Sequence, residues 1–252
     1  NVQSFYSCNQ AALSLYTSSE LSKRTSGIVI EIGYGVCQIV PILDSRPITD
    51  AIVCNNLAGC DLNDRLKQLL FKKNYTFNTN SELDHLNDMK EKLCYVALDY
   101  ESELQKAKMS SEISASYKIG EGKEIIITEE RFSCPELLFK PFVNGFEFAG
   151  IDKSLFVAIN KVHPANIKDM YSNIVLSGGT SMFKGFPERI ENEISKLAPP
   201  TMKVHVVASN EKKYAAWIGA SRIAALENFN ELVITKKEYK DEGAAVFQRK
   251  CY

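Results

Sequence analysis

The sequence predicts an α/β core with a smaller, mostly helical lobe inserted into it. Short apolar runs typical of buried strands alternate with helical apolar patterns toward both ends of the chain. The middle, about residues 59–144, is richer in helical patterns. With 252 residues the chain can bury a sizeable core as one large domain or two modest ones. This shift in pattern favours a core that carries an inserted lobe.

Composition excludes several classes of function. The net charge of −1 gives no electrostatic argument for binding nucleic acid or a membrane surface. The three histidines are far apart, so no zinc site is predicted. Seven cysteines without a C-x-x-C spacing indicate reduced thiols in a cytosol-like compartment. No stretch predicts a membrane span or signal peptide, and the start at Asn1 suggests a fragment or a trimmed chain.

The most informative stretch is Gly27–Leu43, in which two apolar runs flank Gly33 and Gly35. This pattern predicts a tight β-hairpin whose bare backbone N–H groups can approach a phosphate. Glu31 ends the first strand, where a carboxylate can hold a magnesium ion through water. The alternative is a plain hairpin whose glycines serve only a positive φ angle. A single Gly-x-Gly does not decide between the two.

A second stretch, Ile174–Gly185, predicts a buried strand that runs into Ser177-Gly178-Gly179-Thr180 before a helix that starts at Pro187. A strand that ends in a glycine turn before a helix is a common nucleotide-approach geometry.

The remaining elements follow from periodicity and turn residues. A helix over 10–16 precedes a polar loop over Ser18–Ser26. A helix with a Ser81 cap is expected over 81–100, and Lys90 and Glu91 fall off its apolar stripe and should be accessible. We also expect a strand over 48–55, a helix over 56–70 with Asp61 as its N-cap, a hairpin over 115–119 and 124–128, an apolar loop over 142–146, a helix over 155–162, a strand over 203–208 and a helix over 215–226.

Several strings together resemble the actin family in order and spacing. They are QAALSLY, NLAGCDL, KEKLCYVALDY, ERFSCPELLF, YSNIVLSGGTSMFKG, LAPPTMKV, KKYAAWIGAS, ITKKEY and RKCY. The resemblance runs over the whole chain and corresponds to the C-terminal two-thirds of an actin. It implies the actin-like ATPase fold, which has a ribonuclease H-like core sheet with flanking helices. It also implies ATP and a divalent cation in a cleft between two halves.

The resemblance further implies a division of the chain into three parts. Residues 1–22 and 215–252 would be pieces of the outer large subdomain. Residues 23–57 and 147–214 would form the inner α/β subdomain with the phosphate hairpin and the adenosine loop. Residues 58–146 would be the inserted small subdomain.

Nucleotide contacts carry over by position from the family. The resemblance implies phosphate contacts by Gly33, Gly35 and Val36, a ribose contact at Gly59, ribose and adenine contacts by Lys90 and Glu91, an adenosine loop of Gly178, Gly179, Thr180, Met182 and Phe183, and an adenine contact by Lys213. Phe183 stands where actin has Tyr. The implied cofactors are ATP or ADP with Mg²⁺ or Ca²⁺, the cation being held by Glu31 through water.

Departures from the family concern hydrolysis. Actin has Asp at the positions of Glu31 and Tyr34 and His at the position of Gln38, whereas Gln10 is retained where the family positions the attacking water. An amide such as that of Gln38 can orient water but is no base near pH 7. Because hydrolysis needs a positioned water and a path for its proton, we expect weak or absent ATPase activity with nucleotide binding retained.

The resulting expectation is an actin-like, nucleotide-binding cytoskeletal or complex-scaffolding protein. Its partners would be other actin-fold subunits or actin-binding proteins, and its location the cytoplasm or alternatively the nucleus. Direct binding of nucleic acid and insertion into a membrane are not expected. The alternative is a conventional filament-forming actin that hydrolyses ATP; the actin-specific strings argue against a sugar-kinase-like or chaperone-like relative. The loop over Ser18–Ser26, longer than in actin, would alter the partners or be a harmless insertion. The apolar loop Phe142–Phe146 matches the family's hydrophobic plug.

Overall fold

A mixed sheet of six strands forms the centre of the computed structural model, which describes residues 2–22, 24–119 and 123–251. The strand order is β4-β3-β2-β8-β9, and β5 also pairs with β3. The strands are β2 (Gly27–Ile32), β3 (Cys37–Leu43), β4 (Arg46–Pro47), β5 (Val53–Asn55), β8 (Ile174–Ser177) and β9 (Val206–Val207). β2 and β3 form the predicted antiparallel hairpin, and β2 runs parallel to β8. The two predicted glycine turns therefore leave neighbouring strands.

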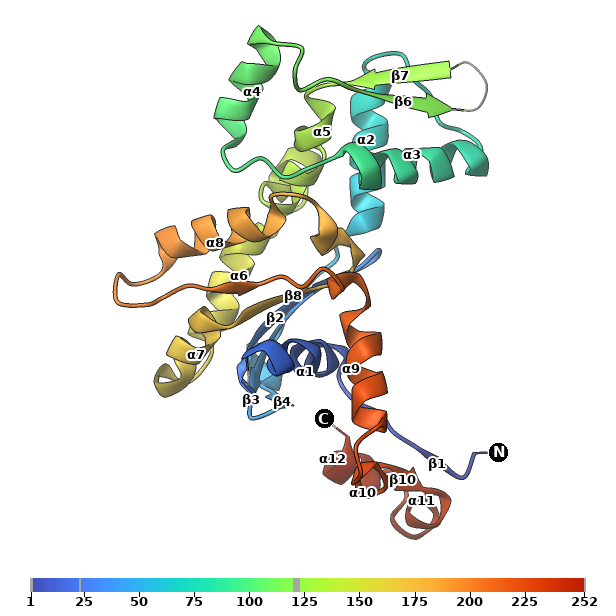
Figure 1. Cartoon of the computed structure of the whole chain (residues 1–252), viewed down its shortest axis with the longest axis vertical. Helices are drawn as coiled ribbons and strands as arrows, with labels where there is room; N and C mark the ends of the chain where they lie inside the picture. Colours follow the sequence, from blue (N-terminus) through green and yellow to red (C-terminus); the bar gives the residue numbers. More distant parts are fainter. Residues whose placement is uncertain (1, 23, 120–122, 252) are drawn as a thin grey trace.

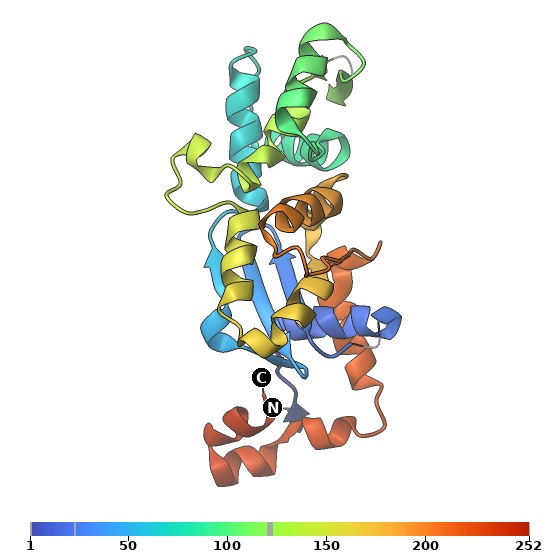
Figure 2. The same ribbon diagram turned by 90° about the vertical axis from the view of Figure 1, so that its left-hand side faces the viewer.

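Side chains on the two faces of the sheet enter two different cores, because successive residues of a strand point to opposite sides. Ile28, Ile30 and Ile32 belong to the larger core, whereas Val29 packs in a smaller one with Leu15. Helix α1 (Gln10–Ser22) covers the smaller side. Helices α6 (Ile151–Asn160), α7 (Ile167–Ser172) and α8 (Phe186–Leu197) lie toward the other side (Figures 1 and 2).

The helical middle of the chain lies at one end of the molecule (Figure 1). It contains α2 (Gly59–Phe71), α3 (Asn80–Leu93), α4 (Tyr100–Met109), the hairpin β6 (Ala115–Ile119) and β7 (Lys123–Ile127), α5 (Glu130–Ser133), and 3-10 helices at Pro135–Leu138 and Pro141–Asn144. Buried residues here, such as Leu66 and Met89, belong to the same core as the sheet. The boundaries 58 and 146 stay a prediction.

The first and last segments meet at the opposite end of the molecule (Figure 1). Strand β1 (Ser4–Phe5) pairs with β10 (Ile234–Thr235). Around them lie α9 (Ala215–Ala224), α10 (Phe229–Leu232), α11 (Lys236–Glu242) and α12 (Ala245–Lys250). Helix α9 packs closely on α1, where an added Cβ at Gly219 would lie 2.0 Å from the Leu13 carbonyl oxygen. A glycine is therefore needed at this crossing.

Two helix boundaries differ from the sequence prediction. The predicted loop starting at Ser18 was wrong over its first part, because α1 continues to Ser22. Packing on α9 outweighs the low helix propensity of the polar residues there. One such contact is the hydrogen bond from the Thr17 hydroxyl to the Ala215 carbonyl, at 2.6 Å. The predicted helix over 81–100 ends at Leu93, and Thr79 rather than Ser81 caps it. The N–H groups of Tyr95 and Val96 bond instead to distant carbonyls, which holds that segment extended.

Three further predictions were wrong in detail. The strand expected over 48–55 is a 3-10 turn (Thr49–Ala51) followed by β5. Asp61 is the third residue of α2 rather than its N-cap, and its carboxylate accepts from the Ala58 N–H at 2.9 Å. The strand expected over 203–208 is limited to β9.

Gly219→Ala should lower the free energy of unfolding by about 2 kcal/mol or more, because the methyl group collides with backbone. Helix propensity alone would favour Ala by about 1 kcal/mol, so the sign separates packing from propensity. Urea unfolding followed by circular dichroism measures the change. Ser221→Ala, an exposed position of the same helix, is the matched control and should change the free energy by less than about 0.5 kcal/mol. A Gly219→Ala protein as stable as the control would contradict the close crossing.

Candidate functional site

A pocket of about 450 Å³ opens where the β2–β3 turn, the start of α2, helix α3 and the segment after β8 come together. It is lined by Gly33, Tyr34, Gly59, Asn87, Lys90, Glu91, Gly179, Thr180, Met182, Phe183 and Lys213. Nine of these are residues for which the sequence predicts nucleotide contacts. The fold thus brings together side chains and glycines that lie up to 180 positions apart in the chain, counting from Gly33 to Lys213.

The carbonyl of Gly33 joins three of these segments. It accepts hydrogen bonds from the Gly59 N–H at 3.1 Å and from the Thr180 hydroxyl at 2.7 Å. The next carbonyl, that of Tyr34, accepts from the Cys60 N–H at 2.7 Å. The first N–H groups of a helix have no partner inside the helix. The hairpin turn satisfies two of them here and fixes the start of α2 against the sheet.

Lys90 forms the polar floor of the pocket. Its side chain is only 4% exposed, and its Nζ donates to the Gly59 carbonyl at 2.8 Å. The prediction that Lys90 would be accessible was therefore wrong, since the residue reaches across to α2 from a position beside the apolar stripe. Burial lowers the pKa of Lys90. Glu91, by contrast, is exposed, as predicted.

A chain of polar side chains forms one rim of the pocket. The Asn63 amide donates to the Asn87 carbonyl oxygen at 3.2 Å, and the Asn87 amide donates to Glu91 Oε1 at 2.9 Å. Glu91 Oε2 lies 3.9 Å from Lys213 Nζ. Asn87 was missed by sequence reasoning. The signal that was present is its position four residues before Glu91, which puts both on one face of α3.

Four of the predicted site glycines fall into two groups. A Cβ at Gly59 would lie 2.9 Å from the Thr180 hydroxyl, and Gly178 has φ +91° with the Ile32 carbonyl 2.3 Å from an added Cβ. Packing or backbone conformation requires these two. Gly33 and Gly35 have neither a positive φ nor any atom within 4 Å of an added Cβ. The alternative hypothesis, in which Gly33 and Gly35 are present only because the hairpin needs a positive φ, was therefore wrong.

The other predicted site residues lie outside this pocket. Gly35 and Val36 are exposed in the hairpin turn, and Gly178 lies behind the pocket, where its N–H donates to the Lys212 carbonyl at 3.0 Å. Glu31 and Gln38 face each other across β2 and β3, on the side of the sheet that α1 covers. Gln10 is exposed at the first residue of α1.

Glu31 is poorly satisfied by its surroundings. Its Oε2 is buried and has no hydrogen-bond partner among the described residues. Burial raises the pKa of Glu31 to about 7. A hydrated divalent cation fits such an orphaned carboxylate oxygen. The residues described here contain no cluster of three or more His, Cys, Asp or Glu that could hold a metal ion, so Glu31 would be a single anchor.

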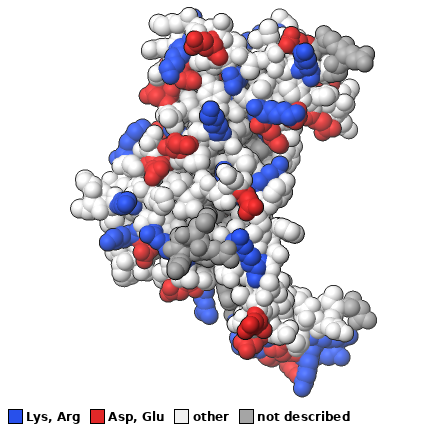
Figure 3. Space-filling model, viewed as in Figure 1, with Lys and Arg blue, Asp and Glu red and all other residues white. Residues whose placement is uncertain are grey.

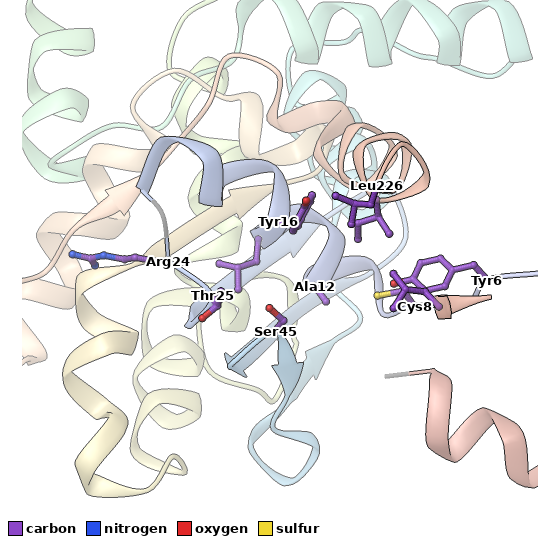
Figure 4. Close-up of a pocket in the computed structure, with 11 residues that line it drawn as sticks. Tyr6, Cys8, Ala12, Tyr16, Arg24, Thr25, Ser45 and Leu226 are labelled. Atoms are coloured by element: carbon purple, nitrogen blue, oxygen red, sulfur yellow. The ribbon is translucent and has the colours of Figure 1, made fainter. Parts of the chain in front are cut away.

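A second, largely apolar pocket of about 180 Å³ lies between α1, the end of α9 and the start of β2 (Figure 4). Its lining includes Tyr6, Cys8, Ala12, Leu15, Tyr16, Arg24, Thr25, Ser45, Ile223, Leu226 and Leu232. Arg24 is held nearby through hydrogen bonds from its guanidinium to Ser172, at 2.6 Å to the carbonyl and 2.8 Å to the hydroxyl. This pocket adjoins the place where α1 is longer than predicted.

The fold and the first pocket define a class: a mixed α/β protein in which a glycine hairpin and a Gly-Gly turn of adjacent strands face one pocket. A family model described as Actin matches residues 1–252, the whole chain. The chain belongs to the actin family. Its mixed α/β structure fits an actin-like fold. Within the described ranges, no helix combines the length and the apolar character needed to cross a membrane.

Stability should depend on pH through Glu31. Because its folded-state pKa of about 7 lies above the ordinary 4.5, the folded chain holds this proton more tightly than the unfolded chain. Raising the pH from about 4.5 to about 7 should therefore lower the free energy of unfolding, by up to about 3 kcal/mol.

Urea unfolding at a series of pH values, without nucleotide or divalent cation, measures this contribution. Glu31→Gln should remove most of the decline between pH 4.5 and 7, whereas Glu101→Gln, at an exposed position, should leave it. An unchanged pH profile in Glu31→Gln would show that the carboxyl group is already ionised in the folded state below pH 7.

Proposed function

We propose that this chain supplies one wall of an actin-type nucleotide site and acts as a cytoskeletal or complex-scaffolding component. ATP or ADP would occupy the pocket of about 450 Å³, with the phosphates against the β2–β3 turn. The protein would work by assembly or by contacts with other actin-fold subunits or actin-binding proteins. Membership of the actin family supports this proposal without deciding its details.

The bare backbone of the hairpin turn is the observation that carries the proposal. The fold does not require glycine at position 33 or 35. An added Cβ would have no atom within 4 Å at either residue, and neither residue has a positive φ. Glycine at such a position is explained by a ligand that approaches the backbone closely. The Gly33 N–H already donates to the Val36 carbonyl at 3.1 Å, so the N–H groups that follow it in the turn would meet a phosphate group.

The remaining pocket residues suit the other parts of a nucleotide. Lys90 places a positive charge at the floor, where the family resemblance implies a contact with the ribose and adenine. Met182 and Phe183 give an apolar side for a flat base, and Glu91 and Lys213 give a polar rim. Mg²⁺ or Ca²⁺, when bound, would neutralise charge on the phosphates, and Glu31 would hold it through water.

We infer that hydrolysis is weak or absent. Tyr34 is 66% exposed at the rim of the pocket and brings no charge to the turn. Gln38 lies opposite Glu31 and can orient a water but cannot accept its proton near neutral pH. Loss of general acid–base groups typically lowers a rate by roughly 10²–10⁴. The alternative function is a conventional actin that hydrolyses ATP during filament assembly.

Two surfaces are suited to protein partners. The apolar pocket beside α1 is one (Figure 4). The other is the 3-10 turn Pro141–Asn144, where Phe142 is 69% and Val143 50% exposed. Figure 3 shows positive and negative side chains interspersed over the face drawn, without one dominant sign. These surfaces favour protein contacts; that the contacts are made in the cytoplasmic cytoskeleton, or alternatively in the nucleus, is part of the proposal and rests on the family.

Substitution of the hairpin glycines tests nucleotide binding. In the native protein, Gly33→Ala and Gly35→Ala should leave the urea midpoint unchanged, because the added methyl group meets open space. The affinity for a fluorescent ATP analogue should fall about tenfold or more, since the methyl group keeps the phosphates from the backbone. Ser221→Ala, at an exposed position of α9 outside the pocket, is a control for binding. Equal affinities in all variants would overturn the proposed phosphate contact.

Phosphate release tests the degraded hydrolytic site. With ATP and Mg²⁺, the native protein should release phosphate slowly or not at all, while it retains bound nucleotide. The double variant Tyr34→Asp, Gln38→His restores a charge and a base, and should raise the rate by roughly 10²-fold. Steady ATP turnover by the unaltered protein would favour the conventional actin. No gain of rate in the double variant would show that Tyr34 and Gln38 are not the cause of slow hydrolysis.

A further inference from the structure

We propose that a small pocket between α2 and the 3-10 turn Pro141–Asn144 binds a free tetrahedral oxyanion such as inorganic phosphate. Its volume is about 60 Å³, which is room for several water molecules or one small ion. The polar part of its lining consists of Arg65, Tyr100, Ser133, Glu136 and Lys140. It shares no residue with the proposed nucleotide pocket or with the apolar pocket beside α1, so the inference is independent of the nucleotide proposal.

Arg65 brings a positive charge that no acidic side chain of the described residues neutralises. Its Nη1 donates to Asn144 Oδ1 at 3.0 Å, whereas its Nε is buried without a hydrogen-bond partner. Among the described residues it takes part in no ion pair. A guanidinium group is charged at every ordinary pH, and a partly buried charge is costly unless it is paired. An anion in the pocket would supply the missing partner.

Lys140 brings a second positive charge to the same pocket. Its Nζ lies 3.5 Å from Glu136 Oε1 and 4.8 Å from the centre of the Tyr100 ring. The distance of 3.5 Å is too long for a strong hydrogen bond, and an ammonium group has three hydrogens to donate. Lys140 therefore has donors left for a ligand.

Two hydroxyl groups add a neutral donor. The Tyr100 hydroxyl lies 3.1 Å from Ser133 Oγ, and either of them can be the donor. Each hydroxyl has one hydrogen, and the bond between the two groups uses only one of these hydrogens. The other hydrogen is available to an acceptor in the pocket. Because Arg65, Lys140 and this hydroxyl pair all donate, the ligand that they suit is an anion with several acceptor oxygens.

The carboxylate of Glu136 does not turn the pocket into a cation site. Buried Arg189 binds both of its oxygens, with Nη1 3.1 Å from Oε2 and Nη2 3.3 Å from Oε1. Arg189 also donates to Glu193 at 2.7 Å. Together with Arg65 and Lys140, these groups make three positive and two negative side chains, so the surplus charge beside the pocket is positive.

The bound ion would join α2 to the 3-10 turn Pro141–Asn144. Arg65 already holds this turn through Asn144, and Lys140 directly precedes its first residue. A ligand that contacts Arg65 and Lys140 together would therefore restrict the turn on which Phe142 is exposed.

Titration calorimetry of the native protein with inorganic phosphate, at an ionic strength kept constant with chloride, tests the site. Arg65→Gln and Lys140→Gln should each weaken the phosphate affinity about tenfold, because each removes a charge-assisted hydrogen bond. Lys108→Gln, at an exposed lysine of α4 outside the pocket, is the matched control and should leave the affinity unchanged. Urea midpoints in chloride alone show whether the variants fold. If Arg65→Gln does not fold, Lys140→Gln decides, since that side chain is 38% exposed.

Amide hydrogen exchange locates the ion. Phosphate should slow exchange over residues 141–146 in the unaltered protein but not in Lys140→Gln, because the ion holds the turn only when both cationic side chains are present. Protection confined to residues 33–36 would put the ion at the β2–β3 turn and overturn the inference. Equal phosphate affinities in all variants would overturn it as well.

Phosphoserine separates a free ion from a phosphoryl group carried on a partner chain. Because the pocket has room only for a small ion, phosphoserine should bind at least about tenfold more weakly than inorganic phosphate. Equal affinities for the two ligands would show that the site recognises a phosphoryl group on a side chain, and the assignment to a free ion would be wrong.

Discussion

The pocket depends on one oxygen atom, the carbonyl oxygen of Gly33. It accepts from a backbone N–H of α2 and from the Thr180 hydroxyl, and so joins the hairpin turn, the helical middle of the chain and the segment after β8. A buried acceptor that lost both donors would cost free energy, which keeps the three segments together. Gly59 has to be glycine because this junction leaves no space for a methyl group. The polar floor follows, since Lys90 binds the Gly59 carbonyl.

Much of the fold and most of the pocket lining could be predicted from sequence. The apolar runs of β2, β3 and β8 are strong local signals, and nine of the residues that the family strings singled out line one pocket. What failed depends on contacts between distant segments. Tyr95 and Val96 look helical locally but bond to Arg131 and Lys184. Lys90 looks solvent-facing by periodicity, yet a carbonyl from another helix receives its ammonium group. Asn87 carried no signal beyond its spacing from Glu91.

Two charged side chains of opposite sign, Lys90 and Glu31, lie near the edge of the sheet in different surroundings. On the pocket side, buried Lys90 is matched by a backbone carbonyl, and burial lowers its pKa. On the α1 side, half-buried Glu31 has a buried oxygen without a partner among the described residues, and burial raises its pKa to about 7. An anion near Lys90 and a cation near Glu31 would each offset the cost of burying the charge of that side chain. Nucleotide and divalent cation are such a pair, which is why the two positions fit one proposal.

Helix α9 has a consequence for how the two pockets are related. It begins two residues after Lys213, on the rim of the larger pocket, and Ile223 near its other end lines the smaller one. Its ten residues span about 15 Å, and the crossing with α1 at Gly219 lies between these points. A side chain at position 219 would press α9 away from α1 and would so disturb the lining of both pockets.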